Sequence, residues 1–381
     1  MSPVYFDNAA TTALRPEVVT VISEALHAHF GNPSSTHSFG RSTKALIERA
    51  RKSIATQLGA KSSEIYFTSG GTEADNLVLR CAVRDLGVRR IITSQIEHHA
   101  VLHVAEAISQ ELGVELDFVQ LDERGFIDYA HLEELLSKPD TPKTLVSLMH
   151  VNNEIGNITD LKIVSSLCNK YNAYFHSDTV QSIGHFNWDL SSLPIHFITA
   201  AAHKFHGPKG VGFLFIRSDT PLKSLIIGGG QERGFRAGTE SVHNILGMEC
   251  AFTLAYKQLD QEKEYILGLK KRFVEGLRGR SPEVRFNGAS DDFERSTYTL
   301  VNVQLPIEGD KATMLLFHLD LKGIACSQGS ACQSGSNQGS HVLRALHEEP
   351  PKYPSLRFSF SIFNTIEQVD YAVDVLCNYL E

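Results

Sequence analysis

Glycines and a hydroxyl side chain stand together near residue 70. The segment Ser69-Gly70-Gly71-Thr72-Glu73 follows an apolar, strand-like run and precedes a helical pattern. A glycine turn that opens a helix leaves free amides at the positive end of the helix dipole, and such amides bind anions. Gly71 and the Thr72 hydroxyl are therefore candidate anion ligands, although an ordinary capped helix gives the same pattern. No Walker motif or G-x-G-x-x-G turn follows a strand here, which argues against ordinary nucleotide binding.

Two further segments place an acid and a lysine at the ends of apolar runs. Asp178 falls just past a strand-like run, where ligands bind in open α/β sheets. An acid there can keep a pyridine nitrogen protonated, which makes the ring an electron sink, although a helix-capping aspartate would give the same pattern. Lys204 follows Ala200-Ala201-Ala202, so its amine is expected to be partly desolvated, which suits Schiff-base chemistry. Anion turn, acid and lysine in this order together favour pyridoxal 5'-phosphate as the cofactor.

The adjacent histidines His98 and His99 raise the question of a metal site. Neighbours on a helix point apart and no third ligand has a fitting spacing, so no metal is predicted. An imidazole stacked on the cofactor ring explains His98 better, with a histidine pair at a helix start as the alternative. The chain has six cysteines and no C-x-x-C pair, which argues against a zinc ribbon or a disulfide framework and predicts reduced thiols.

Composition and charge narrow the class of protein. The net charge of −8 argues against a nucleic-acid partner. The first residues lack the basic start and apolar run of a secretory signal, and the apolar stretches are far too short to span a bilayer. We therefore expect a cytoplasmic protein with no membrane partner.

Apolar strand-like runs that alternate with helical patterns must position these residues. The candidate strands are residues 65–68, 90–93, 115–121, 144–150, 173–177, 197–200 and 211–216. This alternation is typical of an α/β domain with a mostly parallel sheet. After Tyr256 a long charged helix, 257–278, precedes candidate strands 299–304 and 356–360 and a closing helix, 369–380.

The change of pattern near residue 256 predicts two domains. We expect a large domain over residues 13–256 and a smaller α+β domain formed by residues 1–12 and 257–381. Residues 327–340 are rich in Ser, Gly, Gln and Asn. Such a segment cannot form a core, so it is predicted to be a mobile loop of the small domain.

With these segments and several others, the sequence resembles the cysteine desulfurases of the NifS/IscS type, within the fold-type-I, class-V aminotransferase-like pyridoxal-phosphate enzymes. The resemblance covers nearly the whole chain in order; each motif is weak, but the ordered set is highly specific. The matching segments are DNAATT (7–12), FGNPSS (30–35), TSGGTE (68–73), EH (97–98), HVNNEIG (150–156), HK (203–204), GGGQERG (228–234), RAGT (236–239), GSAC (329–332) and RFS (357–359).

The resemblance implies conversion of L-cysteine to L-alanine and a protein persulfide. Lys204 would form the Schiff base with the cofactor and move protons, and His98 would stack on the ring and act as an acid or base. The other implied cofactor contacts are Asp178 at the pyridine nitrogen, Gln181 at the phenolic oxygen, Asn153 near the cofactor and the substrate carboxylate, Gly71, Thr72 and His203 at the phosphate, and Thr239 at the phosphate of the other subunit of a homodimer.

The resemblance also assigns the substrate and sulfur chemistry. Arg357 would clamp the substrate carboxylate with its planar fork, and Asn32 would also contact the substrate. Cys332, in the loop 327–340, would attack the substrate sulfur as a thiolate and pass it to an acceptor such as an iron–sulfur scaffold protein. Cys326, at the end of an apolar run, is expected to be structural, with a second sulfur site as the alternative.

Two departures from the family pattern leave rival functions open. Ala201 stands where the family commonly has a phosphate-binding serine, and losing one hydrogen bond to a charged phosphate costs on the order of 1–3 kcal/mol. Ser361-Ile362 stand where the family often has Gly-Arg. The rivals are a selenocysteine lyase or aminotransferase on the same fold, and a non-catalytic sulfur-relay protein. The Gly-Ser-Ala-Cys segment argues against a plain aminotransferase, and intact Lys204, Asp178 and Arg357 argue against an inert protein.

Overall fold

The computed structural model describes residues 3–139, 141–329, 339–346 and 352–381. The described helices are α1 (Pro16–Ala28), α2 (Ser38–Gln57), α3 (Gly71–Leu86), α4 (His99–Leu112), α5 (Tyr129–Ser137), α6 (Leu161–Lys170), α7 (Val242–Lys257), α8 (Leu259–Arg280), α9 (Gly309–Leu321), α10 (His341–Ala345) and α11 (Ile366–Leu380), with short 3-10 turns η1 (Ser62–Glu64), η2 (Ala202–Lys204) and η3 (Gln231–Gly234). The described strands are β1 (Val4–Tyr5), β2 (Ile65–Thr68), β3 (Arg90–Thr93), β4 (Glu115–Phe118), β5 (Thr144–Ser147), β6 (Tyr174–Asp178), β7 (Phe197–Ala201), β8 (Gly212–Ile216), β9 (Arg285–Phe286), β10 (Leu300–Gln304), β11 (Ile324–Ala325) and β12 (Ser355–Ser359).

A seven-stranded sheet with the order β2-β8-β7-β6-β5-β3-β4 forms the larger part of the molecule. The strands β4, β3, β5, β6 and β7 run parallel, whereas β8 is antiparallel to both of its neighbours, β7 and β2. The predicted α/β fold class with a mostly parallel, mixed sheet is confirmed. None of the described helices combines the length and the apolar character needed to cross a bilayer.

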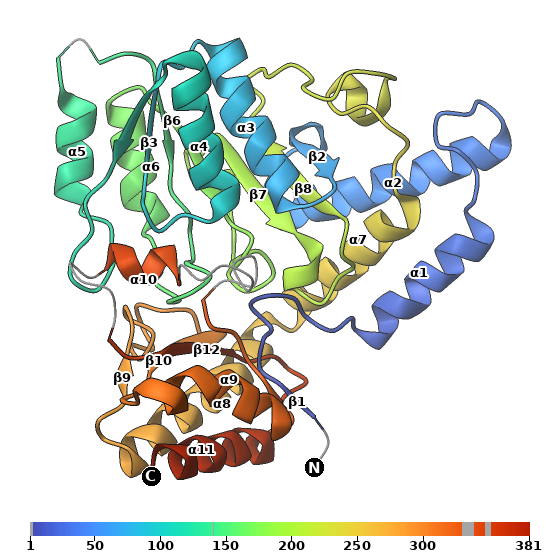
Figure 1. Cartoon of the computed structure of the whole chain (residues 1–381). Helices are drawn as coiled ribbons and strands as arrows, with labels where there is room; N and C mark the ends of the chain where they lie inside the picture. Colours follow the sequence, from blue (N-terminus) through green and yellow to red (C-terminus); the bar gives the residue numbers. More distant parts are fainter. Residues whose placement is uncertain (1–2, 140, 330–338, 347–351) are drawn as a thin grey trace.

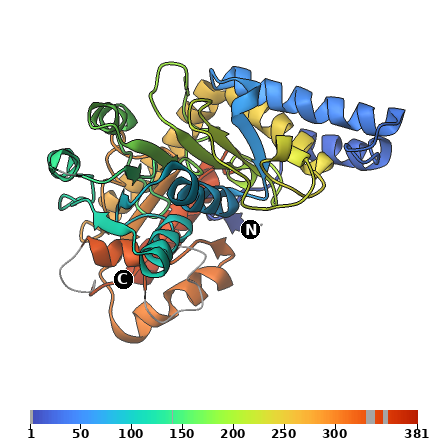
Figure 2. The ribbon, with the colours of Figure 1, turned by 90° about the horizontal axis from the view of Figure 1, so that it is seen from above.

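Both faces of the large sheet are covered by helices, which explains why its strands are continuous apolar runs rather than alternating ones. In β8, Phe213 and Phe215 join the core under α2, α6 and α7, whereas Leu214 and Ile216 join the core under α3 and α4. Figure 2 shows α3 and α4 on one side of the sheet and α2 and α7 on the other.

A smaller part has its own sheets and core. It contains an antiparallel sheet of the order β12-β10-β9 and a parallel pair of β1 with β11. Phe6, Phe273 and Phe358 are fully buried in its core, and Asp7 forms a bridge to Ser359. Figure 1 shows the N-terminal strand β1 among the C-terminal elements α8, α9 and α11. The domain limits at residues 12, 13, 256 and 257 stay a prediction.

Some elements differ from the predicted ones. The charged helix predicted over 257–278 is α8, which begins two residues later because Gln258, with a non-helical φ of −114°, separates it from α7. Helix α2 begins at Ser38, and His37 caps it by accepting a hydrogen bond from the Gly40 amide. Helix α9 was not predicted, because exposed Phe317 and Leu321 blur its apolar periodicity.

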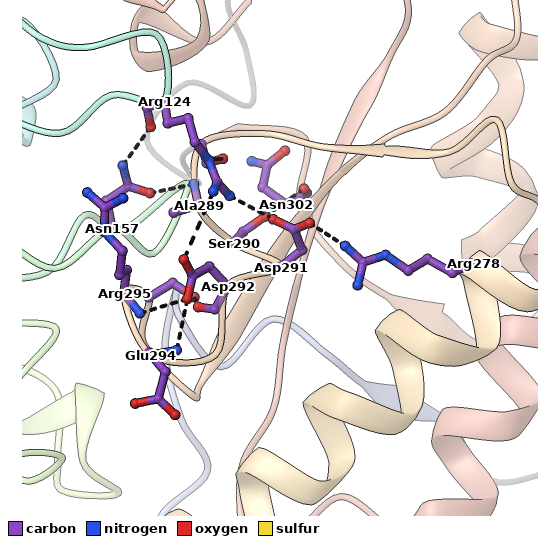
Figure 3. A network of polar contacts seen from close by, with 12 residues as sticks. Arg124, Asn157, Arg278, Ala289, Ser290, Asp291, Asp292, Glu294, Arg295 and Asn302 are labelled. Atoms are coloured by element: carbon purple, nitrogen blue, oxygen red, sulfur yellow. Dashed lines mark hydrogen bonds and ion pairs between the residues drawn. The ribbon is translucent and has the colours of Figure 1, made fainter.

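A polar network joins the two parts beside residues 152–158 (Figure 3). Arg124 of the large part donates to the Gly288 carbonyl at 3.2 Å and pairs with Asp291 at 3.0 Å. Asn157 accepts from the Ala289 amide at 2.8 Å and donates to the Arg124 carbonyl at 2.7 Å. These contacts hold the segment that contains Asn153 against the smaller part.

Candidate active site

A cavity of about 190 Å³ opens where the parallel strands of the large sheet end. Asp178 ends β6, Ala201 ends β7 and Gly71 begins α3, while Arg357 reaches the cavity from β12 of the smaller part. The lining residues are Ala9, Ala10, Gly71, Thr72, Asp75, His98, Met149, Asn153, Asp178, Val180, Gln181, Ala201, His203, Lys204 and Arg357. The carboxyl end of a parallel sheet is where α/β proteins bind ligands.

The structure therefore brings most of the predicted site residues to one cavity. Three predicted residues are not part of it. Thr239 and Asn32 are exposed and do not line this cavity, and Cys332 lies outside the described residues. The individual roles of all these residues stay predictions.

The start of α3 forms an open, positively polarised end of a helix. Gly70 has φ +155° and ψ −175°, a backbone conformation that is essentially confined to glycine. It contributes no side-chain cap to α3, and a Cβ added at Gly71 would come within 2.7 Å of Val180 Cγ2. A side chain at this position would occupy the space in front of the helix start, so the two glycines keep the first amides of α3 accessible to an anion.

Asp178 is a buried acid, with an oxygen that accepts a hydrogen bond from the Val180 amide at 2.9 Å. Burial, and then the nearby charge of Asp75, raise the pKa of Asp178 to about 7. A cationic N–H placed against this carboxyl would lower its pKa again. The site therefore suits a protonated ring nitrogen.

Asp75 lines the same cavity and was missed by the sequence analysis. Its Oδ1 accepts from Thr199 Oγ1 at 2.9 Å, and its Oδ2 has no hydrogen-bond partner among the described residues. Burial raises the pKa of Asp75 to about 7. Its position four residues after Gly71, on the same helix face, was the available signal.

Lys204 follows β7 in the turn η2, and its amine meets the N-terminal segment. Lys204 Nζ donates to the Ala9 carbonyl at 2.5 Å and to the Ala10 carbonyl at 2.8 Å. Gln181 Nε2 also donates to the Ala9 carbonyl, at 3.0 Å. The Ala9 and Ala10 carbonyls, to which the sequence analysis assigned no role, thus hold the lysine in the cavity.

His98 caps the start of α4, and its Nδ1 accepts from the Ala100 amide at 3.1 Å. Since Nδ1 accepts, the proton of the neutral ring is on Nε2. Burial, and then the charge of Lys204, lower the pKa of His98 to about 4. The ring is therefore neutral at pH 7, which suits stacking on an aromatic cofactor.

Arg357 is 1% exposed and is held by two groups. Its Nη1 donates to the Asn153 carbonyl at 2.7 Å, and its Nη2 pairs with Asp7 at 3.0 Å. Its Nε has no hydrogen-bond partner within the described part of the chain. The guanidinium is oriented at the cavity and retains a donor for a ligand acid.

Cys326 lies beside Asp7 and Arg357 at the edge of the smaller core. Burial, and then the charge of Asp7, raise the pKa of its thiol. A thiol that stays protonated is a poor nucleophile. This favours the structural interpretation of Cys326 over a second sulfur site.

A mixed sheet with a cavity at its strand ends, lined by a lysine, a buried acid and an open helix start, is the arrangement expected of the fold-type-I class of pyridoxal-phosphate enzymes. The aminotransferase class-V family matches residues 4–372, so the chain belongs to that family. This confirms the resemblance seen in the sequence.

Several similar proteins carry the name cysteine desulfurase. The cysteine desulfurase IscS of Dictyoglomus turgidum is 42% identical over 99% of this chain and 94% of its own length. The putative cysteine desulfurase IscS 1 of Bacillus subtilis is 40% identical over 98% of this chain and 97% of its own length. The crystal structure of a NifS-like protein from Rickettsia africae superposes with a TM-score of 0.88, at 31% identity over 99% of both chains.

Proposed function

We propose that this protein is a cysteine desulfurase that uses pyridoxal 5'-phosphate to convert L-cysteine to L-alanine and leaves the sulfur as a persulfide on Cys332. The observation that carries the proposal is the convergence of Lys204, Asp178 and Arg357 on one cavity at the strand ends. Full-length similarity to proteins named cysteine desulfurase supports the same reaction.

The residues in the cavity fit this cofactor. Lys204 would attach it covalently, the amides at the start of α3 and His203 would bind its phosphate, and Asp178 would face its ring nitrogen. Neutral His98 would stack on the ring, and Gln181 would donate to the ring oxygen with the second hydrogen of its amide. When bound, the group supplies an electron sink for the substrate's α-carbon.

The substrate carboxylate would bind Arg357, with Asn153 and Asn32 nearby. The Lys204 amine would remove and return protons at the substrate. The Cys332 thiolate would attack the substrate sulfur, so that an S–S bond forms and the substrate's Cβ–S bond breaks. The β-carbon gains the proton, and one thiol plus one cysteine give one persulfide plus one alanine without any other reactant.

The assembly and the sulfur acceptor extend the proposal. Thr239 is exposed and outside its own chain's cavity, which supports the role of reaching the cofactor phosphate of a second subunit in a homodimer. The persulfide would pass to an acceptor protein such as an iron–sulfur scaffold. Persulfide chemistry needs reduced thiols, which supports a cytoplasmic location.

The test uses the purified protein with pyridoxal phosphate and L-cysteine. We expect a visible absorbance band that a Lys204→Ala variant lacks, together with equal amounts of alanine and sulfide in the presence of a thiol reductant. A Cys332→Ala variant should keep the band and lose turnover of L-cysteine; if it still releases sulfide and alanine at the wild-type rate, the persulfide route is wrong. Retained turnover of L-selenocysteine alone would favour the lyase instead.

A further inference from the structure

The short helix α10 packs on the large sheet part, although it comes from the C-terminal region of the chain. Val342 and Leu343 are buried against Ile96 and Ile155 in a hydrophobic cluster separate from the core of the smaller part. Figure 1 shows α10 below the helices of the large sheet and apart from α9 and α11. The helix is therefore docked on the part of the molecule that supplies most of the cavity.

Ser340 attaches the start of α10 to the Asn153 side of the cavity. Its hydroxyl accepts from the Leu343 amide at 3.1 Å and donates to Glu154 Oε2 at 2.5 Å. Glu154 is fully buried and directly follows cavity-lining Asn153. One serine thus caps the helix and ties it to the segment that orients the substrate arginine.

His341 attaches the same helix to the His98 side of the cavity. Its Nε2 lies 2.8 Å from the Glu97 carbonyl, and because a carbonyl only accepts, the imidazole donates. Its ring also packs against the His99 ring at a tilt of 38°, with centroids 4.3 Å apart, and the His99 ring in turn packs against the His103 ring at 4.2 Å. The hydrogen bond and the ring contact both join α10 to the segment at the start of α4.

The two attachment points are themselves fixed by buried hydrogen bonds. Glu97 Oε1 accepts from the Met149 amide at 2.8 Å, and the Glu154 carbonyl accepts from Asn302 Nδ2 at 3.0 Å. Both acids are at most 1% exposed. Buried, hydrogen-bonded groups of this kind define a position closely, so α10 has two rigid anchors on either side of the cavity.

We propose that Ser340 and His341 are positioning residues. They attach the chain to the large part between His98 and Asn153, and so fix where the segment that contains Cys332 ends. Cys332 precedes Ser340 by eight residues in the sequence. The inference rests on the proposed desulfurase activity, because it concerns the approach of the thiol to the substrate sulfur. Misplacing reacting groups by about 1 Å costs roughly a hundredfold in rate.

The experiment compares variants of the full chain loaded with pyridoxal phosphate. His341→Ala should lower kcat for L-cysteine by roughly ten- to a hundredfold, with KM and the cofactor absorbance unchanged. His341→Gln, whose amide can still donate to the Glu97 carbonyl, should recover most of kcat. His103→Ala is the matched control, because it removes the other imidazole that packs against His99 and leaves the hydrogen bond between His341 and the Glu97 carbonyl in place, and it should keep wild-type kcat.

A second readout does not depend on turnover. In the protein without cofactor, His341→Ala and Ser340→Ala should speed hydrogen–deuterium exchange of the α10 amides, whereas Ser340→Thr and His103→Ala should not. Wild-type kcat in His341→Ala, or an equal loss in His103→Ala and His341→Gln, would overturn the positioning role. A wild-type protein that releases no alanine from L-cysteine would instead defeat the proposed function.

Discussion

At the scale of single residues, the cavity wall contains two neighbouring buried acids whose ionised forms are both disfavoured. Burial raises the pKa of both Asp75 and Asp178 to about 7. A cation beside Asp178 would keep that acid ionised, and the resulting negative charge would favour the protonated form of Asp75. With a cationic ring bound, the cavity would therefore present one ionised and one neutral acid to it.

Ala201 bears on how tightly the cavity can bind the cofactor phosphate. It is 2% exposed and lines the cavity without offering a hydroxyl. Ala201→Ser should tighten binding of pyridoxal phosphate by roughly ten- to a hundredfold, because a hydrogen bond to a charged group contributes about 1.5–3 kcal/mol. Fluorescence titration of the cofactor-free protein measures this. Ala200→Ser, which faces the apolar core, is the control and should bring no gain; the same gain in both variants would contradict the assignment.

Lys270 is a buried lysine that forms no ion pair with a carboxylate of the described residues. Its Nζ donates to Ser296 Oγ at 2.8 Å and to the Thr297 carbonyl at 2.7 Å. Burial lowers the pKa of Lys270 from 10.5 to about 7. Between these two pH values the unfolded chain binds more protons than the folded one, so folding stability rises with pH in that window.

The lowered pKa of Lys270 predicts that the difference in melting temperature between the wild type and a variant without this amine depends on pH. From pH 7 to pH 9.5 the melting temperature of the wild type should rise relative to that of Lys270→Met, which lacks the titrating amine. Thermal melts of the cofactor-free protein at several pH values measure it. Lys271→Met, at an exposed position, should follow the wild type, and a constant gap between the wild type and Lys270→Met would show that the amine does not titrate there.

At the scale of elements, the turn η3 is held in an unusual conformation by a buried ion pair. Glu232 has φ +47° and Arg233 has φ +58°, in the left-handed region. The Glu232 carboxylate pairs with Arg51 of α2 at 2.7 Å and accepts from the Phe67 amide at 2.8 Å. This pairing offsets the backbone strain and orients the loop that leads to Thr239.

Breaking this pair should be costly. Arg51→Met leaves the Glu232 carboxylate buried without its partner, and the loss of unfolding free energy should be about 3–5 kcal/mol. Urea unfolding of the cofactor-free protein measures it. The exposed pair Arg80–Glu111 is the control: Arg80→Ala should cost less than about 1 kcal/mol. Comparable losses for both variants would refute the special role of the buried pair.

At the scale of the whole molecule, the cavity lies between two parts that each have a hydrophobic core of their own. Arg357 comes from the smaller part and the other charged lining groups from the larger one. The network around Arg124, Asn157 and Asp291 joins the parts beside the cavity. Substrate contacts therefore depend on how the two parts are held together as well as on each part's own fold.

The proposed homodimer adds a prediction at this scale. If Thr239 acts on the cofactor of the other subunit, a Lys204→Ala chain and a Thr239→Ala chain can together form one intact site. Heterodimers of the two variants should then hold more cofactor per Lys204 and turn over faster than Thr239→Ala homodimers. Mixing and reassembly followed by absorbance and alanine assays measures this. If mixing brings no gain although heterodimers form, Thr239 does not act across the subunits.

Several features of the fold could be predicted because they depend on local pattern. The strand runs at residues 65–68 and 90–93 match β2 and β3, since strands covered on both faces leave uninterrupted apolar runs. The glycine turn before α3 and the acid after β6 were recognisable because their roles follow from their place at strand ends.

Other features needed the folded chain. The carbonyls of Ala9 and Ala10 that hold Lys204 lie almost two hundred positions away in sequence, and backbone groups leave no mark in residue types. Likewise, nothing in the order of residues pairs Arg357 with Asp7 or places His341 on the Glu97 carbonyl.

The sequence by itself determined the class of chemistry: an anion-binding turn, an acid and a lysine, each following an apolar run, in an ordered set of family motifs. The tertiary structure decided which charges meet. Burial of Asp75 beside Asp178, the docking of α10 between His98 and Asn153, and the clamping of Arg357 all arise from contacts between distant segments. Electrostatic shifts and positioning depend on distance in space, which packing alone sets.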